Sequence, residues 1–363
     1  MIYASIITQT ILAICFSYCL GSFILALVPK HCRPRIHLSQ PWILIAVACI
    51  GLLSFVPVLQ IILYIYSENG LMYIVQSVLF TFQVGKAWIL LFIGANLLFI
   101  YVIWVDYREF KKYARIGLTI TISLIAIVGW ASHAGAYDPV IGFISHTIHY
   151  TAISAWCGIL FIISWFSKEY KEWFSFIKWF TPFAIICVIL TIISGLSLMN
   201  FSIADGQYFN SFLSSYGQVL FIKHLLILPL LFFALINGFL IKGALKQNNV
   251  VDIKNWLRAE SFVVFLIFFT TAILGEQAPP HETVINQYNV SFLFSLFYRG
   301  TFKDNMQVVF EISRLGIINF VLSFIFLCAS VYFTLKNRKS LWVFICLIFV
   351  VFTLYLGFLW SIK

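Results

Sequence analysis

The sequence predicts an all-α protein, a polytopic bundle of transmembrane helices, and three observations support that prediction. Of the 363 residues, 62% are hydrophobic and only 10% are charged, too few charges for a soluble fold to cover its surface. Ten apolar runs approach the ~20 residues of helix that cross a hydrocarbon core of ~30 Å. The loops between these runs alternate in positive charge, as the loops of multi-span membrane proteins do.

Each predicted span is close to one bilayer in length. The ten spans are 4–28, 41–66, 86–105, 115–133, 143–166, 178–200, 217–241, 259–277, 312–335 and 340–361. Every odd-numbered loop, counted with the first residue of the span that follows it, holds at least three Lys or Arg residues, whereas the even-numbered loops hold few, chiefly Arg299 and Lys303. Because cytoplasmic loops carry the excess of Lys and Arg, both termini are predicted to be extracytoplasmic. The net charge of +10 then reflects topology and gives no support to nucleic-acid binding.

The predicted organisation is a membrane domain without a soluble appendage. It consists of spans one and two with an interfacial helix (1–80), a core of spans three to eight (81–280), an extracytoplasmic loop (281–311) and spans nine and ten (312–363). Apolar residues recur at helical spacing in 71–82, which predicts a helix lying in the membrane interface. The apolar segment 290–298 is too short to span and is read as a second interfacial helix or a re-entrant cover. A signal peptide is not expected, because the first five residues contain no basic side chain.

The cysteines are predicted to be small apolar packing residues. There are eight, of which seven fall inside predicted spans, and none belongs to a CxxC pair, so neither a disulfide framework nor a zinc site is indicated. Cys15 and Cys19 stand four residues apart on the first span and offer an alternative, two thiolates for Cu(I).

Three histidines indicate a metal site at the extracytoplasmic edge. His133 is expected to close the fourth span, and His146 and His149 open the fifth. The last two are three residues apart, so they are neighbours on one helical face, and the short turn at 137–140 folds His133 back beside them. Neutral imidazole is the commonest side-chain ligand for borderline metals. The alternative is that each histidine caps a helix end or contacts lipid headgroups.

Further soft ligands occur at the matching ends of other spans. Met199 ends the sixth span, His224 lies ~10 Å into the seventh, and His281 follows the eighth. Thioether and imidazole together suit copper better than magnesium or calcium, which prefer oxygen ligands. Taken alone, a methionine such as Met199 is more often a core residue than a ligand.

Two ionisable residues fall within or beside the spans. Lys223 lies on the seventh span and Glu260 at the cytoplasmic start of the eighth, too far apart along the bilayer normal to pair directly. Each is instead expected to belong to a local polar network with a structural or a transport role, and Asn237 is a candidate partner.

A series of short motifs, in order along residues 80–280 and densest over 178–280, resembles the bacterial copper resistance D (CopD) family. They are Ser132-His-Ala, His149-x6-Trp156-x-Gly158, Ser194-Gly195-Leu, Tyr216-Gly217-x-x-Leu220-x-x-Lys223, Asn237, Arg258-x-Glu260 and Ala278-Pro-Pro280. The resemblance implies an inner-membrane protein that moves copper into the cytoplasm, often beside an extracytoplasmic copper-binding partner protein. The chain departs from the family pattern at Gly238, where relatives often carry a basic residue, at Ser132, and in having spans nine and ten.

The function predicted from these observations is copper transport and resistance at the plasma membrane of a bacterium. The ligands are His133, His146 and His149, with Met199, His224 and His281 as further candidates. The chain contains no GxxxxGK[ST] motif, so neither nucleotide binding nor an enzyme activity is expected. Two alternatives remain, a b-type cytochrome whose histidines hold haem and an assembly factor that delivers copper to a terminal oxidase.

Overall fold

The computed structural model is helical and divides into two compact units, Met1–Phe201 and Ser202–Lys363. The residues that it describes are 1–36, 39–66, 70–168, 172–240, 243, 253–280, 290–298, 300, 306–336 and 339–362. Among them, ten segments are long and apolar enough to cross a membrane, and β-structure is limited to two isolated bridges, Ile36 with Ser167 and Phe310 with Ile362. The predicted bundle of ten transmembrane helices is confirmed, while the orientation of the termini stays a prediction.

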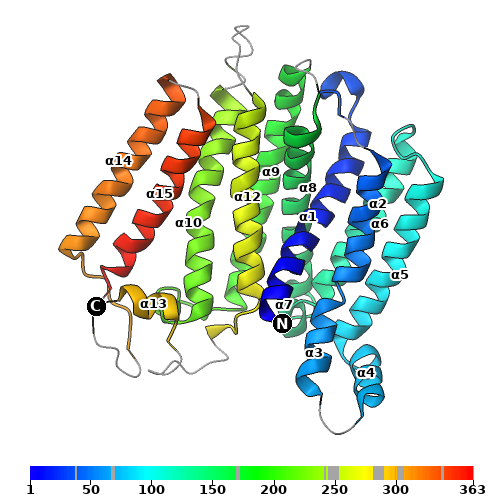
Figure 1. Ribbon diagram of the computed structural model, residues 1–363, viewed down its shortest axis with the longest axis horizontal. Helices are drawn as coiled ribbons and strands as arrows, with labels where there is room; N and C mark the ends of the chain where they lie inside the picture. The colour runs from blue at the N-terminus through cyan, green and yellow to red at the C-terminus, as the bar shows by residue number, and fades with distance from the viewer. Residues whose placement is uncertain are drawn as a thin grey trace. The chain divides into compact units, whose positions relative to one another are not determined.

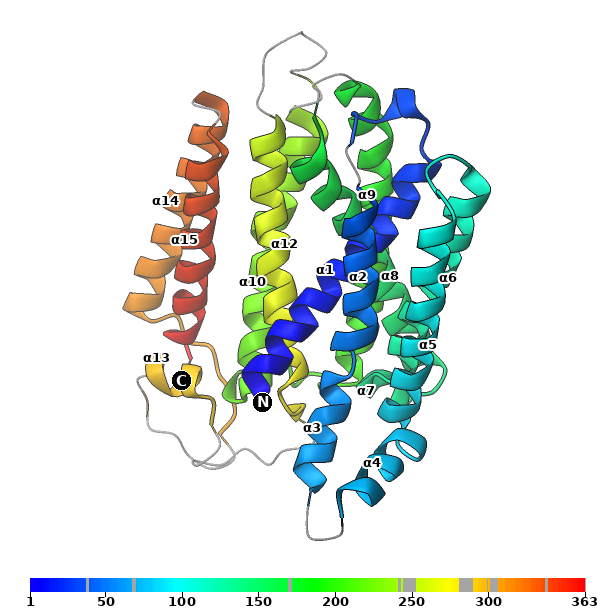
Figure 2. The same ribbon diagram turned by 45° about the vertical axis from the view of Figure 1, so that its right-hand side comes forward.

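The first unit is a bundle centred on one oblique helix, α1. Its elements are α1 (Ile2–Leu27), η1 (Lys30–Cys32), α2 (Gln40–Leu53), α3 (Val56–Ile65), α4 (Leu71–Phe80), α5 (Gln83–Trp104), α6 (Lys111–Trp130), α7 (His133–Tyr137), α8 (Ile141–Phe166) and α9 (Trp173–Asn200). Helix α1 packs against α2, α6 and α8 (Figures 1 and 2). Its side chains Phe16, Leu20 and Phe23 are almost fully buried, so α1 forms the centre of the apolar core of this unit.

Glycines let α1 and α8 cross in backbone contact. A Cβ atom on Gly158 would overlap the carbonyl oxygen of Ser17, and one on Gly21 would overlap the backbone of Gly158. Lipid provides no hydrophobic drive for helix association, so close packing of small residues is a main source of attraction between membrane helices. This crossing gives a structural reason for the Trp156-x-Gly158 motif.

The second predicted span, 41–66, is broken into α2 and α3. Pro57 stands at the second position of α3, where the first turn of a helix tolerates proline, and it leaves the Leu53 carbonyl one turn earlier without its usual donor. Around the break, the carbonyl of Gly51 accepts hydrogen bonds from the Trp88 indole at 3.3 Å and the Ser54 hydroxyl at 3.2 Å. These side chains supply hydrogen bonds to a backbone carbonyl that lipid could not provide.

The helix predicted in 71–82 is confirmed as α4. Val58 and Ile62 of α3 pack against Ile74 and Val78 of α4 in a small apolar cluster of their own, and α4 also packs against α5. Its side chains Leu71, Met72 and Tyr73 are more than half exposed, as expected of a helix that presents one apolar face to its surroundings.

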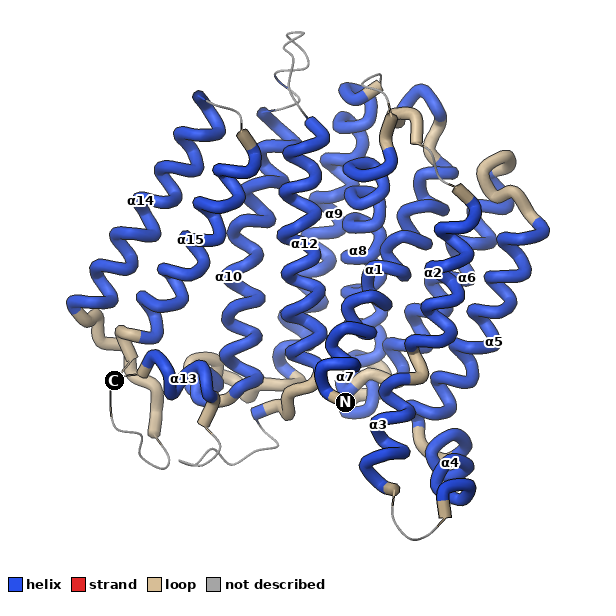
Figure 3. The backbone as a smooth tube through the Cα atoms, in the orientation of Figure 1, coloured by secondary structure: helices blue, strands red, loops and turns tan. Residues whose placement is uncertain are grey.

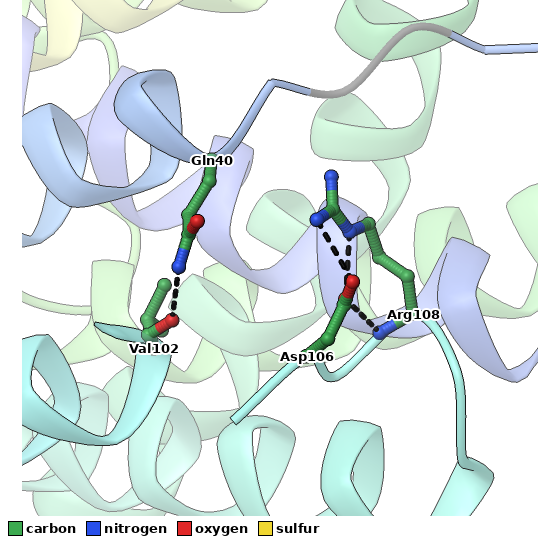
Figure 4. Close-up of polar contacts among 4 residues, drawn as sticks. All are labelled: Gln40, Val102, Asp106 and Arg108. Carbon is green, nitrogen blue, oxygen red and sulfur yellow. Dashed lines mark hydrogen bonds and ion pairs between the residues drawn. The ribbon is translucent and has the colours of Figure 1, made fainter. Parts of the chain in front are cut away.

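Polar contacts tie the loop end of α5 to its neighbours. The Gln40 side-chain amide at the start of α2 donates to the carbonyl of Val102 at 2.7 Å, and Arg108 pairs with Asp106 at 2.7 Å (Figure 4). The hydrogen bonds from the guanidinium hold the pKa of Asp106 below its usual range. The basic loop after α5 is therefore ordered by its own acidic residue.

The second unit pairs α10 with α12 and α15, and α15 with α14 (Figure 3). Its elements are η2 (Asn210–Leu213), α10 (Ser215–Leu235), η3 (a π-helical turn, Ile236–Leu240), α12 (Ile253–Gly275), α13 (Phe292–Phe297), α14 (Arg314–Lys336) and α15 (Ser340–Leu359). Gln218 is fully buried, donates to the Phe212 carbonyl at 2.6 Å and accepts from the Tyr355 hydroxyl at 2.5 Å. This network joins α10 to α15.

The eight cysteines form no disulfide, as predicted. Five of them, including Cys15 and Cys19, are buried among apolar side chains. Cys328 is exposed on α14, contrary to the expectation that the cysteines of the spans are buried, because α14 packs on one side only, against α15.

Candidate functional site

His133 begins a short helix rather than ending the fourth span, and this corrects the sequence-based expectation. Helix α6 stops at Trp130, and the Ser132 hydroxyl then caps α7 by accepting the backbone N–H of Gly135 at 3.1 Å. Serine is a preferred N-cap residue, since its side chain satisfies an otherwise unpaired amide. His133 is therefore the first residue of α7, and it is exposed.

The turn after α7 returns the chain against α8, as the sequence indicated. Asp138 Oδ1 accepts the backbone N–H groups of Val140 at 2.9 Å and Ile141 at 2.8 Å, which fixes the start of α8. A Cβ atom on Gly142 would overlap the carbonyl of Ala134. Helix α7, which carries His133, thus lies in backbone contact with the first turn of the helix that carries His146 and His149.

His149 is held by α9 through one ring nitrogen. Its Nδ1 lies 3.1 Å from the carbonyl oxygen of Thr191 and 3.2 Å from Ser194 Oγ. A carbonyl can only accept, and the Ser194 hydroxyl already donates to the carbonyl of Leu190 at 2.5 Å, so Nδ1 must carry the proton in both contacts. The lone pair of the neutral ring is consequently on Nε2, the arrangement found in metal-binding histidines that donate their other N–H to a carbonyl.

Small and polar residues line the packing seam between α8 and α9 around this ring. A Cβ atom on Gly195 would lie 3.2 Å from His149 Cε1 and 3.5 Å from Nδ1, so glycine leaves just enough room for the imidazole. One turn away, the Ser145 and Ser197 hydroxyls hydrogen-bond at 2.8 Å. Thr191, Ser194 and Gly195 of α9 therefore hold the His149 ring, and we call these three residues the seat of His149.

His146 lies on the same helix in a more apolar setting. Its ring meets Tyr150 edge-on, with centroids 6.1 Å apart and an interplanar angle of 90°. Met199 lies half-buried near the end of α9. The part of the chain that the structure describes includes His133, His146 and His149, and in that part no group of three His, Cys, Asp or Glu side chains is close enough to hold a metal ion. A shared site for the three histidines stays a prediction.

The remaining predicted ligands belong to the second unit. His224 on α10 hydrogen-bonds through Nδ1 to the Tyr208 hydroxyl at 2.7 Å, with the two rings 5.7 Å apart. Burial raises the pKa of Tyr208 to about 12, so the phenol is neutral at physiological pH. His281 lies outside the described residues.

The polar network expected for Glu260 is confirmed. The Asn237 side-chain amide, in the π-helical turn η3, donates to Glu260 Oε2 at 2.5 Å, and both side chains are buried. Sequence reasoning named this pair but missed the residues that position the histidines: Thr191, Ser194, Gly195 and Tyr208. The Ser194-Gly195 motif could be recognised in the sequence. Its contact with His149 could not, because that contact depends on how α9 is rotated against α8.

The comparisons with known proteins identify one region. Residues 174–274, from α9 to the end of α12, match the family model described as copper resistance protein D. No curated protein and no solved structure matches the chain. The matched region contains Ser194, Gly195, Asn237 and Glu260, whose contacts are described above. Residues 174–274 of this polytopic membrane protein are thus similar to the copper resistance protein D (CopD) family.

Proposed function

We propose that this protein transports copper across the plasma membrane of a bacterium, into the cytoplasm, and so serves copper homeostasis and resistance. The observation that carries the proposal is the seat of His149, where the Thr191 carbonyl and Ser194 Oγ bind Nδ1–H and direct the lone pair to Nε2. Partners of this kind fix the ring and tautomer of metal-ligating histidines. The CopD match over residues 174–274, which includes the seat, supports copper as the metal.

Copper is captured by His133, His146 and His149, with Met199 as an adjacent thioether ligand in the first unit. His224 and His281 serve as later ligands, because a transported ion must be bound well enough to enter and weakly enough to leave, which stepwise exchange allows. A periplasmic or extracellular copper-binding protein delivers the ion. The protein performs no catalysis, and the metal gradient or the membrane potential, worth ~2.3 kcal/mol per charge per 100 mV, drives transport.

The binding step is tested with purified protein in lipid nanodiscs. Replacing His133, His146 or His149 singly with Ala should weaken copper binding by about tenfold, which equals ~1.4 kcal/mol, with folding unchanged. A pair of replacements should cost less than the sum, because the ligands share one ion. His31→Ala, a change at an exposed histidine of η1, is the control and should have no effect. Small, additive losses would mean three independent histidines, and a haem absorption band would overturn the copper proposal.

The transport step is tested in intact cells. Expression should raise cellular copper, and the increase should vanish in the His146→Ala, His149→Ala double variant. Accumulation should also be lower at about pH 5.5 than at about pH 7.5, because a protonated imidazole cannot bind metal. If expression leaves the cellular copper content unchanged but raises terminal-oxidase activity, the protein is an assembly factor and not a transporter.

A further inference from the structure

The second unit buries a carboxyl group next to an amide. Glu260 on α12 is 2% exposed and Asn237 is 7% exposed. Asn237 belongs to the π-helical turn at the end of α10, an irregularity that is frequently found at functional sites. His224 stands thirteen residues earlier on α10, about 20 Å away at 1.5 Å per residue, so this pair is separate from His224.

The hydrogen bonding of the pair is incomplete on one side. Asn237 Nδ2 donates to Glu260 Oε2 at 2.5 Å, but Asn237 Oδ1 is buried and has no hydrogen-bond partner in the described part of the chain. A buried acceptor left unpaired is destabilising, because it has lost its hydrogen bonds to water without replacement. An ionised carboxylate has no hydrogen to offer this oxygen, whereas a protonated carboxyl group has one. A protonated Glu260 and Asn237 can therefore form two reciprocal hydrogen bonds.

In the described part of the chain, the elements packed against α12 place no basic side chain beside Glu260. The elements packed against α12 are α10, η3 and α15, and their titratable side chains are Tyr216, Lys223, His224, Cys346 and Tyr355. Lys223 is fourteen residues from Asn237 on α10, about 21 Å along the helix. Tyr355 hydrogen-bonds Gln218 near the opposite end of α10, and the Cys346 thiol adds no positive charge.

The basic residues of α12 itself are not neighbours of Glu260 by helical spacing. Lys254 and Arg258 precede Glu260 by six and two residues, spacings that place side chains on different faces of a helix. A buried carboxylate without a cation is costly within the membrane, and ionisable groups retained there usually serve in ion or proton movement. The orphaned amide oxygen therefore favours a proton at Glu260.

We propose that Glu260 and Asn237 form a proton-binding site whose proton is exchanged for the transported cation. In the closed pair, Glu260 donates its proton to Asn237 Oδ1 and accepts from Asn237 Nδ2. When a copper ion reaches this end of the second unit, the carboxyl proton leaves to water, and the charge of the ion replaces it as the counter-charge of the carboxylate. No bond other than the O–H bond breaks and no electron is transferred. The exchange, unlike the proton site itself, rests on the proposed function.

The proton site is tested without copper, by infrared spectroscopy of the full-length protein in nanodiscs. A carboxylic-acid C=O band should be present at neutral pH and absent in Glu260→Gln. Glutamine can make the same two hydrogen bonds to Asn237, so this variant should fold like the parent protein. Asn237→Ala should keep the band and move it to higher frequency, because the carbonyl loses its donor. Glu311→Gln, at an exposed position, should leave the band unchanged. If the carboxylic-acid band is the same in Glu260→Gln as in the parent protein, the proposal is overturned.

The exchange is tested in proteoliposomes that contain a pH-sensitive dye, with copper supplied as Cu(I) under ascorbate. Entry of copper should be accompanied by countermovement of about one proton per ion, and Glu260→Gln should abolish the proton signal. Copper entry without any proton movement in the parent protein would refute the exchange and leave transport intact. Absence of copper entry with the infrared band present would refute transport and leave the proton site standing.

Discussion

Replacing Gly195 by alanine should weaken copper binding through His149 without touching a ligand. The added Cβ atom would lie 3.2 Å from His149 Cε1, a few tenths of an ångström inside an ordinary contact, so the ring must shift away from α9. The shift lengthens the hydrogen bonds from Nδ1 to the Thr191 carbonyl and Ser194 Oγ, now 3.1 and 3.2 Å. Losing one such bond costs about 1 kcal/mol, and disturbed orienting partners typically cost at least tenfold in metal affinity.

We therefore expect Gly195→Ala to weaken binding by about fivefold to tenfold, and Gly195→Val to weaken it further. The measurement is competitive copper titration of the purified protein against a chelator, with thermal unfolding as a check on folding. Gly275→Ala is the matched control, because a Cβ atom at that helical glycine has no neighbour within 4 Å. If Gly195→Ala binds copper normally while His149→Ala does not, the seat on α9 does not orient the ligand. If both bind normally, His149 is not a ligand.

Three further predictions concern topology, packing and pH. Labels attached at residues 170 or 248 should react only from the cytoplasm and labels at 208 or 287 only from outside; an internal label at 208 would reverse the orientation assigned to the histidines. Gly158→Ala should destabilise the first unit by about 1–3 kcal/mol, because the added Cβ atom would overlap the Ser17 carbonyl. Thermal unfolding measures this loss, and unchanged stability would mean that α1 and α8 do not cross in contact. Asp106→Asn should lower the free energy of unfolding near neutral pH by less than about 1 kcal/mol, since the ion pair with Arg108 is exposed to solvent. Because Arg108 lowers the pKa of Asp106, the difference in stability between variant and parent should disappear as the pH falls through that lowered pKa. A difference in stability that persists in acid would mean that the substitution acts through packing.

The number and approximate limits of the spans could be predicted from sequence because they depend on local composition. A run of apolar residues must be helical in lipid, where every backbone group needs an internal partner, and the ten runs became ten candidate spans. The break before Pro57 was within reach of the same reasoning, since proline leaves the carbonyl one turn earlier without its usual donor. It was missed because hydropathy stays high through Ser54 and Phe55, and composition alone does not register a change of direction.

The details of the site depend on contacts between segments far apart in the chain. His149 could be identified as a candidate ligand, and Ser194-Gly195 as a motif, but their contact depends on how two helices are rotated about their axes. The π-helical turn at Asn237 has no sequence signature of its own. Nevertheless, the partnership of Asn237 with Glu260 could be anticipated, because a buried carboxyl group must find a polar neighbour.

The break between α2 and α3 also affects how the protein fits its membrane. Residues Gln40–Ile65 form a segment of 26 residues, about 39 Å long if straight, whereas the hydrocarbon core of a bilayer is ~30 Å thick. A rigid helix of that length would have to tilt or thicken the bilayer around it. Because the chain changes direction at Ser54 and Phe55, with the Gly51 carbonyl accepting a hydrogen bond from Trp88, the excess length is taken up by α3 alone. Helix α2 can then keep its packing against α1 and α5 in membranes of different thickness.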